Sequence, residues 1–511
     1  MEGIMAIYFL PATIVLLTLI TSVFLLISST SKRRRSKSPP SPPSLPFIGH
    51  LHLLKEPIHR TLQTLSNKYG PIFSLTLGVR RAIVVSSPAL AEECLNKNGA
   101  VFADRPHGLL GWKIIGYNCT ALGHTPYGAH WRNLRRLSTV ELLSTARLNS
   151  FLHVRQDEVK RLVNGLVGEG SGFSEVDMRS RLMGLSMNIV MRMVAGKRYF
   201  GEAGHDEEGE RFKKLIREAF DLSGTTNPVD FLPVLRLVDF SGLEGRMWAA
   251  HKGTDEFFQR LIEENRSSYG EREGSNEKTM IDTMLNLQEA EPQVYTDEII
   301  KGQIMTMILA GTDTSAGTIE WAISLLLNHP EILNKARAEL DIVIGHNQLV
   351  QESDYTKLSY LQGIINETLR LYPPGPLLMP HQSLEDCIIG GYPIPKQTML
   401  FVNAWAIHRD PLIWEDPARF WPERHIIGVE SDGYKFLPFG VGRRSCPGSG
   451  LANRVVSSAL GALIQCFEWK RNGEGLLDMK EGLGIVMPKA EPLKALCKPR
   501  ECMTNIFMAG D

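Results

Sequence analysis

Apolar residues recur at helical spacing along most of the chain, and Ser, Thr, Asp or Pro stands near many of the expected helix starts. This combination is typical of amphipathic or buried helices. Short β-rich runs are fewer. The pattern therefore predicts a mainly α protein with a small β-sheet region. Helices are expected over residues 56–69, 88–98, 128–145, 149–168, 176–196, 208–223, 243–269, 296–329, 330–344, 357–371 and 448–466, and strands over 72–77, 82–86, 388–394 and 398–403.

Two polar stretches interrupt this pattern, at residues 201–210 and 264–292. Both are rich in charged residues or glycine, which favours surface loops between helices over domain linkers. Neither an internal repeat nor a convincing linker divides residues 48–511. We therefore expect this part of the chain to form one domain.

The first 30 residues follow a different pattern. Residues 4–27 carry no charged side chain, and a helix of that length spans about 36 Å, more than the ~30 Å core of a bilayer. A basic cluster at 32–37 follows this stretch, which places the emerging chain in the cytosol by the positive-inside rule. A cleaved signal peptide is the alternative, but it requires charges before a shorter apolar core. The sequence predicts a single N-terminal transmembrane helix within residues 1–30.

Residues 31–47 are basic and then rich in proline, with five prolines between 39 and 46. Each proline fixes φ and removes an amide donor, so the segment is expected to be stiff and extended. It would hold the following domain at a set orientation to the membrane. The alternative is a plain linker, which differs only in whether the segment packs on the domain.

Composition narrows the class of protein. The 511 residues include 56 Lys and Arg against 56 Asp and Glu, so no basic excess exists for binding nucleic acid. The hydrophobic fraction of 43% is ample for large buried cores and excludes a disordered chain. Seven cysteines without a C-x-x-C pair fit neither a disulfide framework nor a zinc ribbon. These features favour a globular protein in a reducing compartment.

Cys446 stands apart from the other cysteines because it lies in the run F-G-V-G-R-R-S-C-P-G, residues 439–448. Glycines on both sides let the backbone come close to a flat group. A helix that starts just after the sulfur offers amide donors and a positive dipole end, which favour thiolate over thiol. A thiolate so placed is a candidate metal ligand. The alternative is a glycine-rich turn before a buried helix, with an incidental cysteine.

The run fits F-x-x-G-x-R-x-C-x-G at every fixed position, and on it the chain resembles the cytochrome P-450 superfamily of haem-thiolate monooxygenases. The resemblance extends over nearly the whole chain. It implies a haem b cofactor, with Cys446 as the axial ligand of the iron, Phe439 near the sulfur, Gly448 beside the haem and Arg444 on a propionate. Thiolate ligation suits oxygen activation because electron density pushed to iron favours O–O cleavage.

The long helix expected at 296–329 carries the polar group A-G-T-D-T-S, residues 310–315, within an apolar run. Gly311 weakens the helix and Thr314 can bond back to a carbonyl one turn earlier, so the helix can open to admit oxygen or water. Without any resemblance to a known family, the run A-G-T-D-T-S would fit a contact between two helices through small residues equally well. It matches the superfamily's oxygen-activation motif, which implies that Asp313 and Thr314 relay protons and that Ala310 lies at the haem.

Glu367 and Arg370 are three residues apart on an expected helix and share a face. Alone, such a pair is most often a solvated surface bridge. Its apolar neighbours and the P-E-R segment ending at Arg424 resemble the superfamily's buried E-x-x-R pair. The resemblance implies that the three residues form a structural lock behind the haem pocket. His425 is a departure, since Phe is commonest there.

Three further residues resemble haem contacts. Trp131 and Arg135, at i and i+4, share a helical face and resemble a pair that contacts a propionate. The alternative interpretation of these two residues is a helix that the Trp side chain covers and on which the Arg side chain is exposed. His381 occupies a position where many relatives carry a propionate-binding Arg, and it can donate there with a charge that depends on pH.

The resemblance also implies an apolar pocket for a hydrophobic small molecule. Each residue assigned to this pocket could equally be ordinary core. The expected lining residues come from the loop at 108–121, the 208–223 helix, the long helix, the segment after Pro373 and the C-terminal region: Trp112, Ile115, Phe220, Met307, Leu377, Leu378, Ile485 and Val486.

The proline-rich hinge, the run Y-P-P-G-P at 372–376 and the run E-D-C at 385–387 resemble the plant microsomal A-type group, most of all its isoflavone-hydroxylase and lignan-oxidase branch. The resemblance implies an NADPH- and O2-dependent monooxygenase on the cytosolic face of the endoplasmic reticulum. Its substrate would be a flavonoid or isoflavonoid, lignan, terpenoid or alkaloid, which it would hydroxylate or close into a methylenedioxy bridge. Electrons would come from NADPH-cytochrome P-450 reductase, docked on basic residues such as Arg132, Arg136, Lys435 and Arg443.

Two alternatives stay open. One is an enzyme of the same fold that isomerises or rearranges a substrate without external oxygen, although such members often lose the threonine equivalent to Thr314. The other is a haem-binding or sensor protein without turnover, against which the intact Asp313 and Thr314 argue.

Overall fold

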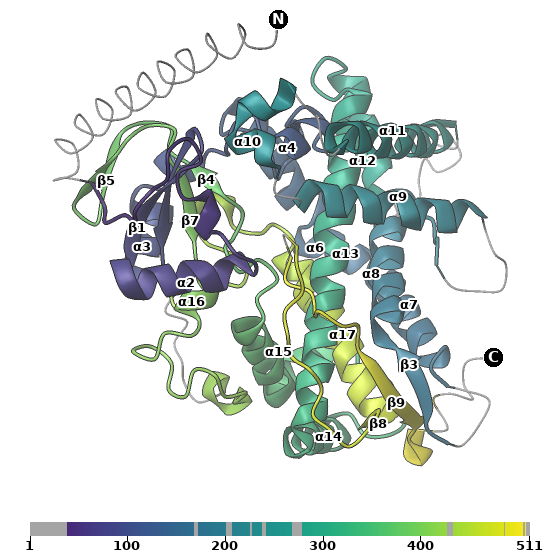
Figure 1. Ribbon diagram of the computed structural model, residues 1–511. Helices are drawn as coiled ribbons and strands as arrows, with labels where there is room; N and C mark the ends of the chain where they lie inside the picture. The colour runs from purple at the N-terminus through teal and green to yellow at the C-terminus, as the bar shows by residue number, and fades with distance from the viewer. Residues whose placement is uncertain are drawn as a thin grey trace, which may run out of the picture.

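The computed structural model describes residues 38–167, 172–200, 207–224, 227–237, 242–267, 278–426, 433–484, 486–503 and 506. Helices predominate and small sheets lie toward the periphery, so the expected fold class of the domain is confirmed (Figure 1). The transmembrane helix expected within residues 1–30 lies outside the described residues, as does the basic cluster at 32–37. Within the described ranges, none of the helices is long and apolar enough to cross a bilayer.

The longest helix, α13 (Asp297–Asn328), runs through the centre of the molecule (Figure 1). Its start follows from the sequence, because the Thr296 side chain accepts from the Ile299 amide and two acids occupy the first turn. Around it pack α8 (Met178–Ala195), α11 (Leu243–Ser267), α15 (Ser359–Leu371) and α17 (Ser449–Cys466). The remaining α-helices are α2 (Ile58–Tyr69), α3 (Pro88–Glu92), α4 (Leu110–Ile114), α5 (Ala129–Arg136), α6 (Thr145–Ser150), α7 (Leu152–Asn164), α9 (Glu207–Gly224), α10 (Pro228–Phe231), α12 (Met280–Ala290), α14 (Pro330–Val343) and α16 (Ala404–Ile407).

The largest sheet has the strand order β1-β2-β7-β4, in which β1 and β2 form a hairpin and β7 runs parallel to β2. The run expected as one strand at 388–394 is a hairpin, because Gly390 and Gly391 both adopt positive φ between its two halves. The strands are β1 (Ile72–Leu77), β2 (Arg80–Val85), β4 (His381–Gln382), β5 (Cys387–Ile389), β6 (Tyr392–Ile394) and β7 (Met399–Val402), and a further sheet holds β3 (Ser174–Asp177), β8 (Phe467–Arg471) and β9 (Lys494–Pro499).

The interpretation of residues 264–292 as a loop was wrong, because it contains the helix α12. A capping box between Thr279 and Asp282 starts this helix, and Met280, Ile281 and Met284 are buried. Charged residues on both sides hid this short apolar stretch. The sheet of β3, β8 and β9 was also missed, since its strands are short and come from distant parts of the chain.

The proline-rich segment packs on the domain. The carbonyls of Pro39 and Pro40 accept hydrogen bonds from the hydroxyl and amide of Ser74 on β1, at 3.2 and 2.8 Å. The ring of His50 lies 2.8 Å from the Pro42 carbonyl. These contacts distinguish the segment from a plain linker.

Two hydrophobic clusters meet along α13. One contains Ile300, Ile304 and Ile308 of its first half, and the other contains Ala316 and Ile319 of its second half. The polar group predicted at 310–315 falls between them. The fold therefore places this group inside the molecule, at the junction of two cores.

Candidate functional site

The loop before α17 is folded back on itself around Cys446. The Cys446 amide donates to the Phe439 carbonyl at 2.8 Å. Gly442 adopts φ +73°, and a Cβ there would lie 2.3 Å from the Leu95 carbonyl oxygen, so glycine is required. Cys446 is an exposed residue at the end of this loop, although the protein packed around its sulfur still desolvates the thiol.

The sulfur of Cys446 has the surroundings that the sequence suggested. Burial raises the pKa of the Cys446 thiol, and hydrogen bonds from the Gly448 and Ser449 amides and the charge of Arg135 oppose that rise. A coordinated metal removes the thiol proton outright, and the same amides and guanidinium then stabilise the anion. A Cβ on Gly448 would lie 3.8 Å from the sulfur, so the space beside it stays free of side chain.

Arg135 and Arg444, both expected at the haem, lie close to the Cys446 loop. Arg135 Nη1 donates to the Ser445 carbonyl at 2.5 Å, one residue before the cysteine. Arg444 donates to backbone carbonyls at 2.6 to 3.4 Å and lies 4.4 Å from the ring centre of Trp131. The predicted pair of Trp131 and Arg135 therefore shares one site with Arg444.

Arg105 is a residue that the sequence analysis missed. Its side chain is buried and donates to the carbonyls of Gly123, Met379 and Pro380 at 2.8 to 3.0 Å. Burial, followed by the charge of Arg444, lowers the pKa of Arg105 to about 9. Arg105 directly follows Asp104 in the sequence, and such a pair of opposite charges is typical of a solvated loop. No local pattern therefore predicts that Arg105 is buried.

The hydrogen bonds described for Arg105, Arg135 and Arg444 go to uncharged oxygens. Arg105 is buried, Arg135 and Arg444 are partly buried, and the charge of Asp104 acts on Arg105 and Arg444. Three positive charges so placed are stabilised by a further anion. A haem carries two propionates. The three guanidinium groups can bind these anions and the Cys446 sulfur can bind the iron, so the residues present fit a haem. Phe439 and Gly448 lie in the same loop on either side of the cysteine.

His381 is placed differently from the expectation. Its Nδ1 lies 2.8 Å from the Phe102 carbonyl, so this nitrogen must carry the proton. Burial, together with the charges of Arg105 and Arg444, lowers the pKa of His381 to about 3. A neutral ring in this tautomer has no N–H left to offer a propionate. Arg105 is therefore the better donor for an anion at this position.

The middle of α13 is accessible although most of the helix is buried. Ala310 is exposed, whereas Ile308 and Thr312 on either side are buried. The Thr314 hydroxyl donates to the Ala310 carbonyl at 2.6 Å, as the sequence predicted. The exposure of Ala310 between buried neighbours is consistent with the expected position of this residue at the haem.

Gly311 has another role than the expected opening of the helix. The helix is continuous from 297 to 328. A Cβ on Gly311 would lie 2.9 Å from the Val190 side chain of α8, so glycine allows the two helices to approach. The weak point predicted from helix propensity is therefore a packing contact.

The carboxyl of Asp313 lies near the accessible part of α13 and has a perturbed pKa. Burial and then the charge of Asp221 raise the pKa of Asp313 to about 6, while Arg217 and Arg179 oppose the rise. A carboxyl group that titrates near neutral pH can both give and take protons under physiological conditions.

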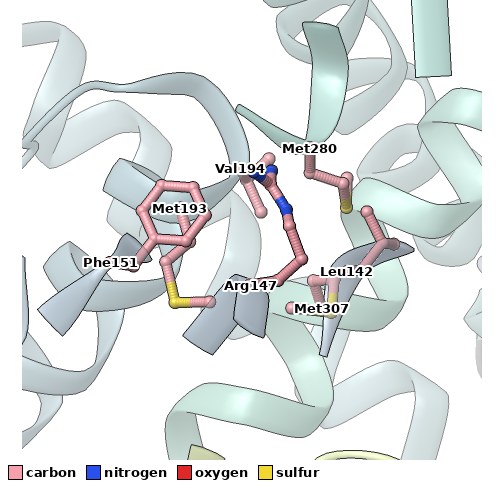
Figure 2. Close-up of a pocket in the computed structure, with 7 residues that line it drawn as sticks. All are labelled: Leu142, Arg147, Phe151, Met193, Val194, Met280 and Met307. Atoms are coloured by element: carbon pink, nitrogen blue, oxygen red, sulfur yellow. The ribbon is translucent and has the colours of Figure 1, made fainter. Parts of the chain in front are cut away.

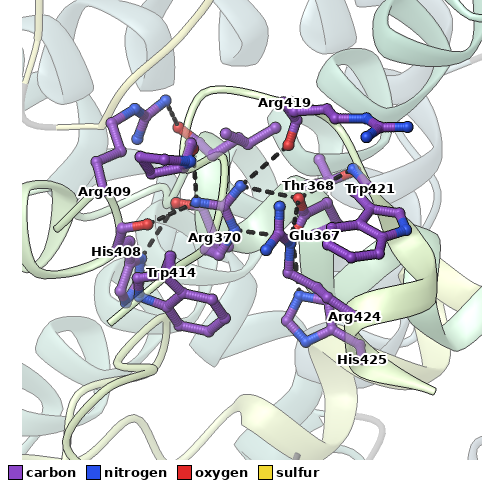
Figure 3. Close-up of polar contacts among 12 residues, drawn as sticks. Glu367, Thr368, Arg370, His408, Arg409, Trp414, Arg419, Trp421, Arg424 and His425 are labelled. Atoms are coloured by element: carbon purple, nitrogen blue, oxygen red, sulfur yellow. Dashed lines mark hydrogen bonds and ion pairs between the residues drawn. The ribbon is translucent and has the colours of Figure 1, made fainter. Parts of the chain in front are cut away.

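The lock predicted from Glu367 and Arg370 forms a buried network (Figure 3). Two guanidinium nitrogens of Arg370 donate to Glu367 at 2.8 Å, with both side chains fully buried, and Arg424 Nε donates at 3.1 Å. His425 Nε2 lies 2.9 Å from the same carboxylate. Burial alone would raise the pKa of Glu367, but these hydrogen bonds and charges prevail and lower it to about 2. The structure thus brings together the three predicted residues and adds His425.

The residues expected to line the pocket are only partly brought together. Trp112 of α4 and Ile115, which directly follows α4, are buried, and α4 contacts both α9, which carries Phe220, and α11. A Cβ on Gly440 of the Cys446 loop would lie 3.8 Å from the Leu378 side chain. The neighbouring Leu377, like Val486, is partly buried, and Ile485 lies outside the described residues.

Met307 lines a different cavity from the one expected. It borders a small space, with room for about one water molecule, between η4 (Leu137–Leu142), α6, α8 and α12 (Figure 2). The other residues around this space are Leu142, Arg147, Phe151, Met193, Val194 and Met280.

Two of the four basic residues expected to dock a reductase, Arg132 and Arg443, lie against the same aromatic ring. Arg132, Arg136, Lys435 and Arg443 are all exposed. The guanidinium groups of Arg132 and Arg443 each lie 5.8 Å from the ring centre of Tyr127. Tyr127 therefore links Arg132 of α5 to Arg443 of the loop.

Comparison with known proteins agrees with this geometry. The family model for Cytochrome P-450 matches residues 39–494. Cytochrome P-450 81Q32 of Catharanthus roseus is 56% identical over 470 residues, which are 92% of this chain and 93% of that protein. The Isoflavone 3'-hydroxylase of Medicago truncatula is 51% identical over 94% of this chain and 96% of its own length.

Two more similarities extend the comparison. The (+)-piperitol/(+)-sesamin synthase CYP81Q2 of Sesamum radiatum is 49% identical over 94% of this chain and 95% of its own length. A zebrafish cytochrome P-450 structure with progesterone superposes with a TM-score of 0.75 at 26% identity, covering 87% of this chain and all of that one. The chain therefore belongs to the cytochrome P-450 family, and it is an oxidoreductase of the monooxygenase class with a haem-thiolate cofactor.

Proposed function

We propose that this protein is an NADPH- and O2-dependent monooxygenase that oxidises a hydrophobic plant specialised metabolite, by hydroxylation or by closing a methylenedioxy bridge. The isoflavonoid and lignan classes come first, because similar proteins are named Isoflavone 3'-hydroxylase, Isoflavone 2'-hydroxylase and (+)-piperitol/(+)-sesamin synthase. The observation that carries the proposal is the accessible centre of α13, where Ala310, Thr314 and an acid with a pKa near 6 lie together.

The bound haem supplies the oxygen-activating chemistry, and the residues of the chain serve it in distinct ways. Cys446 would ligate the iron, with its negative charge stabilised by the Gly448 and Ser449 amides. Arg105, Arg135 and Arg444 would hold the propionates, and Trp131 supports Arg444 through its ring.

Proton delivery would fall to Asp313 and Thr314. A carboxyl with a pKa near 6 is partly protonated at neutral pH and can be reprotonated from solvent. The Thr314 hydroxyl donates to the Ala310 carbonyl at 2.6 Å, so to act as a relay it would rotate away from this carbonyl, give its proton onward and take one from the acid. Apolar side chains of α4, α9 and the segment after Pro373 would exclude water around the substrate.

We assign residues 1–30 to a membrane anchor in the endoplasmic reticulum, 31–47 to a hinge and 48–511 to the catalytic domain. An apolar surface supports contact with the membrane: Phe47, Val79 and Val234 are each more than two-thirds exposed. They come from neighbouring loops, since the Gly78 and Val79 amides bond to the carbonyls of Ile48 and Phe231.

NADPH-cytochrome P-450 reductase would dock at Arg132, Arg136, Lys435 and Arg443. Reversing the charge of Arg132 and Arg443 together should lower reductase-supported turnover at low salt, where exposed charges are least screened, and less at high salt. The matched control is reversal of Lys68, which is exposed on α2. Equal turnover of the double variant and the wild type at low salt would contradict this docking site.

The test of the proposed function is turnover of isoflavonoids and lignans in microsomes that contain this protein and a reductase, under isotopically labelled O2. Hydroxylation adds one labelled oxygen atom to the product, and bridge formation removes two hydrogen atoms while O2 and NADPH are consumed. A product with the mass of the substrate, formed without O2, would instead establish the rearranging enzyme. NADPH consumption that no candidate substrate stimulates would support a protein without turnover.

A further inference from the structure

His408 connects the buried ion pair of Glu367 and Arg370 to the loop that carries Cys446. It follows α16 directly and is fully buried. Its Nδ1 lies 3.2 Å from the Arg370 carbonyl oxygen (Figure 3). Its Nε2 lies 2.8 Å from the Leu437 amide. One side chain thus bridges α15 and the segment that begins nine residues before the cysteine.

The two partners determine the state of the ring. A carbonyl only accepts, so Nδ1 carries a proton, and a backbone amide only donates, so Nε2 carries a lone pair. Only the neutral imidazole with its proton on Nδ1 makes both hydrogen bonds. Burial and the charges of Arg409 and Arg370 lower the pKa of His408 to about 3, in agreement with a neutral ring.

The bridge is attached firmly at both ends. At the α15 end, Arg370 Nη1 donates to the His408 carbonyl at 2.6 Å, so the two residues bond in both directions. At the other end, Leu437 is fully buried and its carbonyl accepts from the Gly440 amide at 3.1 Å. The Phe439 carbonyl then accepts from the Cys446 amide. A continuous series of short contacts runs from Arg370 to the cysteine.

Aromatic contacts hold the same segment from a second side. The ring of Phe436, next to Leu437, lies 5.5 Å from the ring of His408 and 5.5 Å from the ring of His425. His425 is itself bonded to the Glu367 carboxylate. The segment at 436–437 is therefore held by two histidines, and of these two it is His408 that bonds to its backbone.

We propose that His408 is a positioning residue that fixes the Cys446 loop against the Glu367–Arg370 pair and thereby sets the position of the sulfur under the haem. The proposal depends on Cys446 as the haem ligand and not on the identity of the substrate. Without the ring nitrogens, the buried Leu437 amide and Arg370 carbonyl each lose a partner, and the loop gains freedom to move.

Two substitutions separate the hydrogen bonds from the ring. His408→Phe keeps an aromatic ring against Phe436 and removes both bonds. His408→Gln keeps one donor and one acceptor in a side chain of similar reach. Both are compared with the wild type as full-length holoenzyme. The readouts are hydrogen–deuterium exchange of the Leu437 amide and the fraction of the reduced carbonyl complex with the thiolate-type absorption band.

We expect exchange at Leu437 to become roughly tenfold faster or more in His408→Phe, with part of the thiolate-type band lost. His408→Gln should recover most of both properties. The matched control is His425→Phe, which retains a ring against Phe436 and should leave the Leu437 exchange rate close to that of the wild type.

Unchanged exchange and an unchanged band in His408→Phe would overturn the proposal. If His408→Phe fails to fold, the two readouts in His408→Gln test the proposal instead. Retention of both Leu437 protection and the band supports the proposal, whereas loss of the band with the Leu437 amide still protected would overturn it. Neither readout involves substrate, so a wrong assignment of the substrate leaves this test intact.

Discussion

The centre of α13 and the network around Glu367 both bury a carboxyl group inside the protein, with opposite results. At Glu367, hydrogen bonds from Arg370, Arg424 and His425 outweigh the effect of burial, and the pKa falls to about 2. At Asp313, the effect of burial prevails and the pKa rises to about 6. The first carboxylate stays ionised and fixed, which suits a structural lock. The second is poised to exchange protons, which suits chemistry.

The difference extends to the surroundings of each group. Glu367 is fully buried and its partners come from two segments more than fifty residues apart in sequence, which the ion pairs hold together. Asp313 is only partly buried and lies next to residues that solvent reaches. Rigidity at the lock and access at the middle of α13 thus follow from how completely each charge is compensated.

The largest effect is expected at the lock. Glu367→Gln leaves Arg370 and Arg424 without their anion and should lower the free energy of unfolding by about 3 to 5 kcal/mol. Asp313→Asn, a change of the same kind, should not lower it at pH 7, because this substitution removes a carboxyl group whose ionisation is opposed by burial. Chemical denaturation of the two variants checks this, and equal losses would contradict the comparison.

Thr314→Ala should act on chemistry with little effect on stability. Loss of the hydroxyl removes a proton relay, so product formed per NADPH consumed should fall by roughly tenfold or more. The measurement compares product with NADPH oxidation in the reconstituted system. Thr318→Ala is the matched control, because its hydroxyl makes the same bond to a carbonyl one turn earlier. Unchanged coupling in Thr314→Ala would exclude the relay.

The pH dependence of stability should distinguish the two carboxyl groups. The pKa of Asp313 is raised in the folded chain, so its contribution weakens stability as pH rises from about 4 to about 6, by up to about 3 kcal/mol. Asp313→Asn should remove that loss. The pKa of Glu367 is lowered, so its contribution is complete above about 4.5 and is lost as pH falls toward 2. Denaturation at a series of pH values measures the contributions of both carboxyl groups. Identical stability profiles for the wild type and Asp313→Asn would contradict the contribution assigned to Asp313.

Patterns confined to one stretch of sequence were sufficient for much of the fold. The start of α13 at its Thr296 cap, the helix after Cys446 and the strands of the β1–β2 hairpin were predicted, because caps, periodicity and glycines act over a few residues. The helix α12 escaped, since its apolar face is short and its burial comes from contacts with α8 and α11.

Tertiary structure alone decided which polar groups are buried and what compensates them. Arg105 acquires its role from carbonyls some 275 residues away, and His408 from a helix and a loop on either side of it in sequence. The Cys446 motif and the amides that follow it indicated a thiolate from local sequence, but the Arg135 guanidinium and the buried ion pair that hold the loop come from distant segments. Solvation and charge compensation depend on all neighbours in space, whereas local sequence specifies only those along the chain.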